Sequence, residues 1–266
     1  MTVPLTATET EAAAATAPAT APPAAPALSP ALRRMVGQLA LGARMLSLDG
    51  HDDFNQGQIS ARQPGADTFL IKSALCGFDE ATPDQMVQAS VDGAAPPPRS
   101  APPELPLHQA IYQARPDVNA IVHSHAPHTL VFGAMDLPVR PISHEGAYFT
   151  DRTGLFTETS NTVLDLDTGR RIALALAEHP AVFLRNHGGV VVGKSVRHAA
   201  VFAQVLERAC RLQLAAERAG VPYHWSSAQD VELKLGFIYA DLSVRSYWDY
   251  AVRRVARTWP ECGQWL

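Results

Sequence analysis

Apolar residues recur three or four positions apart in several stretches of the chain, the spacing that gives a helix one buried face. The first stretch runs from Leu32 to Leu46, and Ser29-Pro30 in front of it supplies a capping hydroxyl and a proline suited to a first helical turn. Asp49-Gly50 then ends this helix. The same spacing predicts a long helix over 195–220, and the residues over 230–257 predict mixed helical structure.

Shorter apolar segments bounded by turn residues predict strands. These segments are 58–62, 68–72, 118–125, 181–184 and 190–192. A turn at 63–67 joins the first two, and Asn186-His187-Gly188-Gly189 forms a turn between the last two. A compact helix at 104–114 precedes the third. Because the chain shows neither a regular βαβ order nor a GxGxxG or P-loop pattern, we expect no nucleotide cofactor.

Composition narrows the class of protein. The 266 residues, of which 47% are apolar and 18% charged, suffice for one large domain with a buried core. The net charge of -4 argues against a nucleic-acid or anionic-membrane surface, and no apolar run approaches the roughly 20 residues that span a bilayer. Three widely spaced cysteines fit a reducing compartment. We therefore expect a cytoplasmic protein with no nucleic-acid and no membrane partner.

The start of the chain differs from the rest. Residues 1–29 are rich in Ala, Pro and Thr and cannot build a core, so we expect a disordered tail there. We expect residues 30–266 to form a single domain that includes the C-terminal helical segment.

Three histidines form the most informative constellation. On a strand, positions i and i+2 face the same side, so His123 and His125 can converge on one ion. Such pairs also occur by chance, but burying two imidazoles is costly unless each finds a partner. His187, in a glycine turn between two apolar strands, adds a third ligand. Three protein ligands leave coordination positions open, which is typical of a catalytic rather than a structural metal site.

Other polar residues lie near these histidines in the sequence. Glu104 opens the helix that leads into the histidine strand and can reach the metal or the substrate, although a glutamate in a first turn is also favoured by the helix dipole. We expect His108, which shares its helix face, to be structural. Pro127 rotates His128 away from the strand face, so we expect it to support the site rather than bind the metal.

Four segments resemble the class II aldolase/adducin family over roughly 32–219. The first, Gly57-Gln58-Ile59-Ser60-Ala61-Arg62, is similar to the family's G-N-[IV]-S-x-R strand. Segment 104–117 is similar to its E-x-x-x-H-x-x-[IL]-Y-x-x-R-P-D helix. Segment 121–128 matches its metal-binding strand, and 184–195 its L-x-N-H-G-x-x-x-x-G-x-S segment. The order and spacing of these motifs make the resemblance specific.

The resemblance implies an α/β fold with a central, largely antiparallel β-sheet flanked by helices on both faces. It implies that one divalent metal ion per subunit is bound by His123, His125 and His187, with Glu104 as the acid/base. Three imidazoles suit Zn, Mn, Fe or Co. The resemblance also implies a homo-oligomer, commonly a tetramer, whose active sites lie at subunit interfaces, so that C-terminal aromatic residues can complete a neighbour's pocket.

The chain departs from the sugar-phosphate members of the family where they bind phosphate. Gln58 replaces the usual Asn, Lys72-Ser73-Ala74-Leu75 replaces T-P-[ST]-G, and Pro102-Pro103 replaces S-S. Proline has no amide N–H, so this loop loses donors for a phosphate. A phosphorylated substrate is therefore not expected.

The remaining residues suit a small-molecule carboxylate. Lys72 and Ser73 take the place of the phosphate loop, and Arg62 is a further candidate for binding the anion, although structural pairing explains an arginine equally well. His144 belongs to a loop that approaches the site in the family. A catalytic role and no role fit His144 equally.

This combination is similar to the decarboxylase branch of the family, which acts on hydroxylated aromatic or pyridine dicarboxylates. We therefore expect a metal-dependent lyase that decarboxylates a hydroxy-aromatic or related carboxylate through a metal-stabilised enolate, with Glu104 or His144 protonating the carbanion. An aldolase that cleaves a non-phosphorylated hydroxy-keto acid would use the same metal and the same glutamate. An adducin-like interaction protein with a vestigial site is the non-enzymatic alternative.

Overall fold

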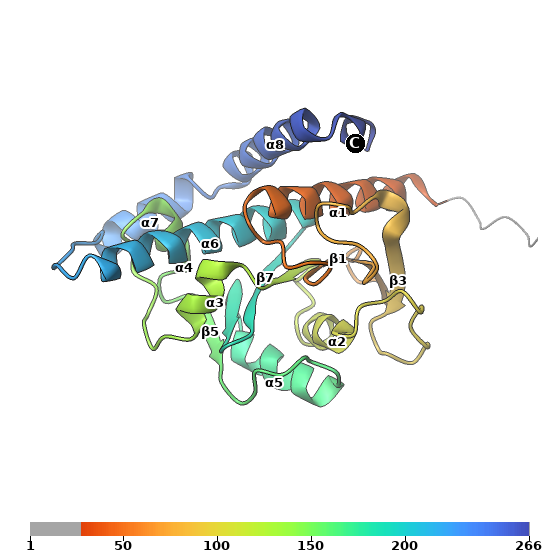
Figure 1. Ribbon diagram of the computed structural model, residues 1–266, viewed down its shortest axis with the longest axis horizontal. Coiled ribbons are helices and arrows are strands. Elements are labelled where there is room, and N and C mark those ends of the chain that lie inside the picture. Colours follow the sequence, from red (N-terminus) through yellow and green to blue (C-terminus); the bar gives the residue numbers. More distant parts are fainter. Residues whose placement is uncertain (1–27, 266) are drawn as a thin grey trace, which may run out of the picture.

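A seven-stranded sheet forms the centre of the computed structural model, which describes residues 28–265 (Figure 1). Its strands follow the order β3-β2-β1-β4-β7-β6-β5, and every neighbouring pair is antiparallel except β5 and β6. In chain order the strands are β1 (Gln58–Ala61), β2 (Thr68–Lys72), β3 (Met86–Ser90), β4 (Ala120–Ser124), β5 (Thr153–Phe156), β6 (Ala181–Leu184) and β7 (Gly188–Gly193). The expectation of a central, largely antiparallel sheet is confirmed, whereas the tail expected over 1–29 lies almost wholly outside the described residues.

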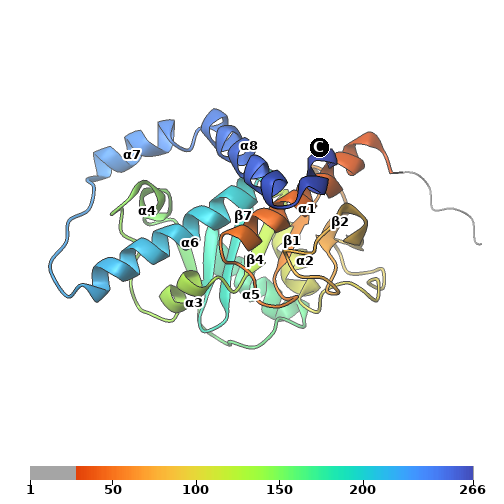
Figure 2. The same ribbon diagram turned by 45° about the horizontal axis from the view of Figure 1, so that its top comes forward.

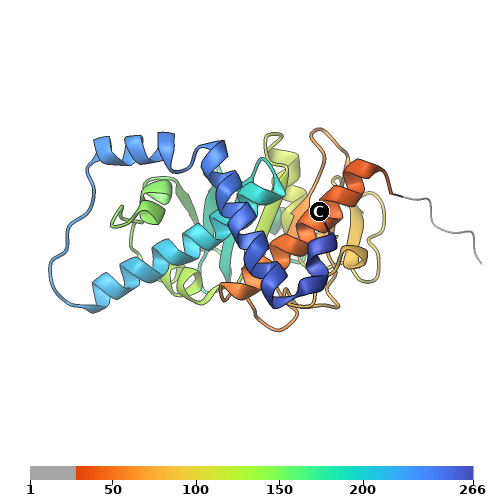
Figure 3. The same cartoon turned by 90° about the horizontal axis from the view of Figure 1, so that it is seen from above.

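Helices cover both faces of the sheet, as expected. The helices on one face are α1 (Pro30–Leu48), α6 (Val196–Arg218) and α8 (Asp241–Thr258), and those on the other are α2 (Leu105–Ala114) and α5 (Leu166–Leu176). Figures 1 and 3 show the first group lying across the top of the sheet. Successive residues of β4 alternate between two apolar cores, with Val122 in the first and Ile121 in the second. Burial on both faces explains the nearly continuous apolar sequence of this strand.

Shorter helices complete the chain. They are α3 (Pro127–Gly133), α4 (His144–Phe149), α7 (Ala228–Phe237) and the 3-10 helices η1 (Pro83–Gln85) and η2 (Pro260–Gln264). No residue of α7 is buried, and Figure 2 shows this helix away from the sheet, beside α4. Among residues 28–265, no helix combines the length and the apolar character needed to cross a membrane.

The sequence patterns do not predict β3, β5 or α5. Both strands are short and form the two edges of the sheet. An ideal Cβ on Gly154 of β5 would lie only 1.9 Å from the Ala175 carbonyl oxygen, so glycine is what lets α5 approach this strand. Because glycine is unfavourable in strands, the residue that packing requires also hides the strand from a sequence pattern.

A buried histidine lies in the core next to β1. His108 Nδ1 lies 2.8 Å from Ser60 Oγ, and the same oxygen lies 2.8 Å from Tyr112 Oη. The ring of His108 is fully buried and stacked against Phe69. Burial, which costs the imidazolium its hydration, and a smaller contribution from the nearby His123 together lower the pKa of His108 to about 3. His108 is therefore neutral at ordinary pH, which suits the structural role expected for it.

We predict that the metal-free protein loses stability as the pH falls below 6.5, because His108 takes up a proton in the unfolded chain and not in the folded chain. Each pH unit below that value costs about 1.4 kcal/mol from this group, until the folded-state pKa of about 3 is reached. Denaturant melts of His108→Gln should show a shallower dependence of unfolding free energy on pH by this amount. His224→Gln, which changes an exposed histidine, is the control. A His108→Gln slope equal to that of the wild type would contradict the prediction.

Candidate metal centre

Four polar side chains converge where β4 ends. Each offers one ligand atom, and these atoms all lie within 4.8 Å of one another. The cluster consists of Glu104, His123, His125 and His187. The structure therefore brings together the predicted ligands and the predicted acid, which come from three separate parts of the chain.

The pairing of β4 with β7 brings His187 to the other two histidines. His123 pairs with Val190 in this antiparallel ladder, so the turn that joins β6 to β7 lies beside the end of β4. Asn186 has a φ of 58° and thereby closes the turn just before His187. An ideal Cβ on Gly188 would lie 2.4 Å from the carbonyl oxygen of Ser124, so only glycine allows the turn to approach β4 this closely.

Two of the imidazoles are held from their outer nitrogens. His123 Nδ1 donates to the Gly189 carbonyl at 3.0 Å, and His125 Nδ1 donates to Asp53 Oδ2 at 2.8 Å. Since a carbonyl or carboxylate only accepts, each Nδ1 carries the proton and each Nε2 presents a lone pair. Both Nε2 atoms are buried: that of His123 faces Glu104 Oε2 at 3.1 Å, and that of His125 has no hydrogen-bond partner among residues 28–265. Buried lone pairs that point into a shared cluster fit a divalent metal ion.

Glu104 is the N-cap residue of α2, and its carboxylate faces the histidines. Oε2 lies 3.1 Å from His123 Nε2 and Oε1 lies 3.3 Å from His187 Nε2. The Val163 amide donates to Oε1 at 3.0 Å, and Gln58 Nε2 donates to Oε2 at 3.4 Å. Burial alone would raise the pKa of Glu104, but in the metal-free site the positive charge of a protonated His123, together with hydrogen bonds from His123, His187 and the Val163 amide, holds it well below its usual range. The carboxylate is therefore ionised and able to accept a proton or to bind a metal.

Lys72 and Ser73 do not present free donors for a substrate, contrary to what the sequence suggested. Lys72 is 1% exposed, and its ammonium donates to three main-chain carbonyls, those of Asn55, Ser73 and Cys76. These contacts use the three N–H groups of the ammonium. The hydroxyl of Ser73 donates its single proton to the Ser100 carbonyl. Both side chains tie neighbouring loops together rather than bind an anion directly.

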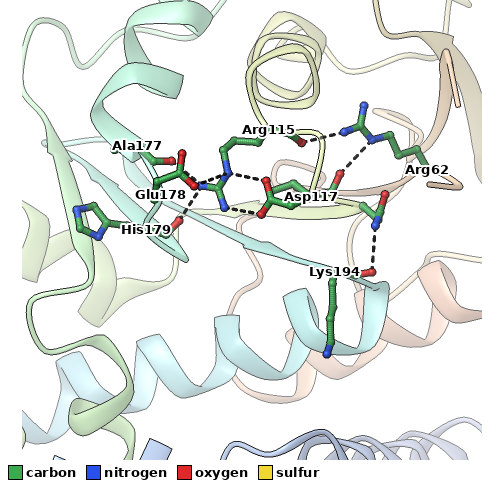
Figure 4. Close-up of polar contacts among 9 residues, drawn as sticks. Arg62, Arg115, Asp117, Ala177, Glu178, His179 and Lys194 are labelled. Carbon is green, nitrogen blue, oxygen red and sulfur yellow. Dashed lines mark hydrogen bonds and ion pairs between the residues drawn. The ribbon is translucent and has the colours of Figure 1, made fainter. Parts of the chain in front are cut away.

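Arg62 was also expected to contact the substrate, and the structure places it elsewhere. It follows the end of β1 that is remote from His123. Its guanidinium donates to the carbonyls of Val118 and Arg115 at 3.0 and 2.9 Å (Figure 4). Arg62 therefore fixes the loop between α2 and β4. Structural pairing, rather than substrate binding, explains this arginine.

His144 does not join the cluster of its own chain. It opens α4 and lines a separate cavity of about 620 Å³ against α1, α6 and α8, whose lining includes no member of the cluster. The other polar and aromatic residues of this cavity include Glu145, Glu207, Arg208, Arg211, Tyr239, Tyr247, Tyr250 and Arg254. A catalytic role for His144 within one chain is therefore not supported.

His128 supports the segment that follows the metal strand. Its Nδ1 lies 2.6 Å from Glu207 Oε1, which also accepts its main-chain amide at 3.0 Å. The other oxygen of Glu207 accepts the amide and the hydroxyl of Thr129, each at 2.8 Å. Glu207 thereby binds the N–H groups at the start of α3. His128 is not part of the cluster, as expected from the break at Pro127.

Sequence reasoning missed the residues that hold the cluster from outside. Asp53, Val163 and the carbonyl of Gly189 lie 72, 59 and 66 positions away from their partners. Hydrogen bonds over such separations leave no spacing pattern in a single sequence. In the sequence Gln58 stands out only as a departure from a motif, whereas in the structure it donates to Glu104.

Comparison with known proteins agrees with the expected relationship. The profile of the Class II Aldolase and Adducin N-terminal domain matches residues 37–214. Decarboxylase NovR of Streptomyces niveus is 32% identical over 160 residues, which cover 59% of this chain and 59% of NovR, less than two thirds of its length. The 3,4-dihydroxyphthalate decarboxylase of Arthrobacter keyseri is 27% identical over 236 residues, which cover 83% of this chain and 94% of that enzyme.

Solved structures show the same architecture. An aldolase II superfamily protein from Pseudomonas syringae superposes with a TM-score of 0.77 at 28% identity, covering 87% of this chain and 95% of that one. The L-fuculose 1-phosphate aldolase of Glaciozyma antarctica gives a TM-score of 0.75 at 20% identity, covering 91% and 96%, and supports the fold alone. The profile match, the shared sheet and the shared order of motifs lead to one conclusion: this chain is a member of the class II aldolase and adducin family.

Proposed function

We propose that the chain is a divalent-metal-dependent carbon–carbon lyase that decarboxylates a non-phosphorylated hydroxy-aromatic or related carboxylate. The observation that carries the proposal is the convergence of three histidines on the Glu104 carboxylate, with the buried Nε2 atom of His125 left without a hydrogen-bond partner among the described residues. The two related decarboxylases support this reaction class.

His123, His125 and His187 would hold one metal ion in each subunit. The donor set of three imidazoles suits Zn, Mn, Fe or Co. Such an ion, when bound, supplies Lewis-acid stabilisation of an enolate-like oxygen. Within the chain, the Gly189 carbonyl and the Asp53 carboxylate accept hydrogen bonds from the outer nitrogens of His123 and His125.

The loops near the cluster favour a carboxylate over a phosphate ester. The amides of Ser73 and Ala74 already donate to the carbonyls of Gln85 and Ser100, and Pro102-Pro103 has no amide proton to offer. Few main-chain donors therefore remain to surround a phosphate. The N–H groups of Lys72 are all used by main-chain carbonyls, so this residue would not bond to the substrate directly. Its buried positive charge still makes the local electrostatic potential favourable for an anionic substrate.

Glu104 has the geometry of a proton carrier for this reaction. Its ionised carboxylate accepts the proton of the substrate hydroxyl as that oxygen becomes an aryloxide. The bond from the ring carbon to the carboxylate then breaks, its electron pair stays on the ring, and carbon dioxide leaves. Glu104 returns the proton to that carbon, so the products are carbon dioxide and the decarboxylated aryloxide, and the carboxylate is regenerated.

His144 fits the proposal only from a neighbouring subunit. It lines a cavity with three tyrosines that includes no residue of its own cluster. Tyr250 of that cavity is 55% exposed, and Phe237 of the nearby α7 is 80% exposed. We propose a homo-oligomer, tetrameric as in many family enzymes, in which this cavity faces the metal centre of another copy and His144 serves as a second acid.

We predict that protein loaded with Zn, Mn, Fe or Co releases carbon dioxide from a member of a panel of hydroxylated aromatic carboxylates.

Glu104→Gln should keep its metal and lose about 10²–10⁴-fold in turnover, because it cannot accept the proton. His187→Ala should lose most of its metal. Elemental analysis and carbon dioxide detection measure both. Release of an aldehyde or pyruvate from hydroxy-keto acids would instead indicate an aldolase, and wild-type protein without bound metal or turnover would indicate an adducin-like scaffold.

Mixed oligomers test the interfacial site. His123→Ala and His144→Ala should each be poorly active alone. Each proposed site takes its metal cluster from one subunit and His144 from another. After equal amounts of the two variants exchange subunits, about one quarter of the sites should pair an intact cluster with an intact His144 and recover activity. Mixing His123→Ala with His187→Ala is the control, because both changes damage the same half. If the first mixture recovers no more activity than the control, His144 does not act across an interface.

A further inference from the structure

The segment between α1 and β1, residues 51–57, lies along the end of β4, where it bonds to Ser124 and His125 and approaches the backbone of His123. His51 Nδ1 lies 2.8 Å from Ser124 Oγ, and Asp53 Oδ2 accepts from His125 Nδ1 at 2.8 Å. At Gly57, whose φ is 72°, an ideal Cβ would lie 3.4 Å from the carbonyl oxygen of His123. We call residues 51–57 the supporting segment.

Asp53 is held in place within this segment. The Gln56 amide donates to the Asp53 carbonyl at 3.0 Å, and Gln56 Nε2 donates to Asp53 Oδ2 at 3.2 Å. This oxygen is the one that accepts from His125. The Asp53 carboxylate therefore sits in a closed turn with two donors on one oxygen, and its position does not depend on the imidazole alone.

Lys72 anchors the same segment to β2. Its ammonium donates to the Asn55 carbonyl at 3.2 Å, and Asn55 Nδ2 donates to the Ala74 carbonyl at 2.9 Å. The buried lysine thus connects the supporting segment to the loop after β2. A rigid connection on both sides leaves the Asp53 carboxylate little freedom to leave His125.

We propose that Asp53 is the positioning residue for His125, fixing the proton on Nδ1 and aiming Nε2 at the metal site. The inference rests on the proposed metal site and adds to it an outer residue on which metal affinity depends. An imidazole without this acceptor populates both tautomers, and the one protonated on Nε2 cannot bind a metal through Nε2, the nitrogen that faces the cluster. A carboxylate partner also makes the ring a stronger donor toward a cation.

The neighbouring Asp52 provides a matched comparison. It carries the same charge one position away, but its carboxylate accepts from Ser47 Oγ at 2.8 Å rather than from a histidine. A general effect of negative charge near the site would therefore involve both residues, whereas orientation of His125 involves Asp53 alone.

The test measures metal binding by the full-length chain, using Zn²⁺ in competition with a chromophoric chelator. We expect Asp53→Ala to bind Zn²⁺ about 10–100-fold more weakly than the wild type. Asp53→Asn keeps an acceptor oxygen and should recover part of the loss, and Asp52→Ala should stay within about twofold of the wild type, since it makes no contact with a ligand. Thermal melts of the metal-free variants check that each is folded.

A second measurement needs no metal. In the metal-free wild type, nitrogen NMR of labelled histidine should show His125 protonated on Nδ1, and Asp53→Ala should show a mixture of tautomers. Unchanged Zn²⁺ affinity in Asp53→Ala, or an equal loss in Asp52→Ala, would overturn the proposal. Wild-type protein that binds Zn²⁺ tightly but releases no carbon dioxide would remove the proposed reaction and leave the role of Asp53 intact.

Discussion

The antiparallel pairing of β4 with β7 is the constraint on which the metal centre depends. It sets the turn that carries His187 beside the strand that carries His123, and it presents the Gly189 carbonyl to His123 Nδ1. β4 lies at the middle of the sheet with an apolar core on each side. A slip of one residue would move His123 to the opposite face and bring apolar side chains into the cluster, so the two cores hold the register that the chemistry needs.

Hydrogen-bond satisfaction separates the structural charged residues from the chemical ones. Arg62 and Lys72 are buried cations, but main-chain carbonyls accept from both, so neither has a need for a ligand. His123 and His125 are the opposite case, because main-chain and carboxylate oxygens accept from their outer nitrogens while their inner nitrogens converge on the cluster. An unpaired buried nitrogen is not decisive by itself, because His51 and His108 also leave Nε2 without a hydrogen-bond partner among residues 28–265. What sets the cluster apart is that its nitrogens and a carboxylate oxygen lie close enough together to share one cation.

The sequence was most informative where the determinant is local. Helix α1 begins at Pro30 behind a Ser29 cap, as its pattern predicts, and the HxH spacing on β4 predicts two convergent imidazoles correctly. The sequence was least informative where a charged side chain could bond to several different partners. Nothing in the sequence shows that Lys72 bonds to three carbonyls or that Asp53 reaches His125, because both depend on how loops close over the sheet edge. The motif positions therefore predict the members of the cluster. Only the geometry of the loops shows which nearby charged side chains are free to contact a ligand.

In the proposed oligomer, the site combines the cluster at the sheet of one subunit with the helical cavity of another, and the two parts differ in physical character. The cluster is fixed to the central sheet, where packing on both faces leaves little freedom. The cavity that contains His144 is formed by helices and by C-terminal tyrosines that are partly exposed. In the proposed interfacial arrangement, changes in the helical half would alter which substrate fits without disturbing the imidazoles. Such a division would give a physical reason why a protein similar in fold to one named as an aldolase is also similar in sequence to one named as a decarboxylase.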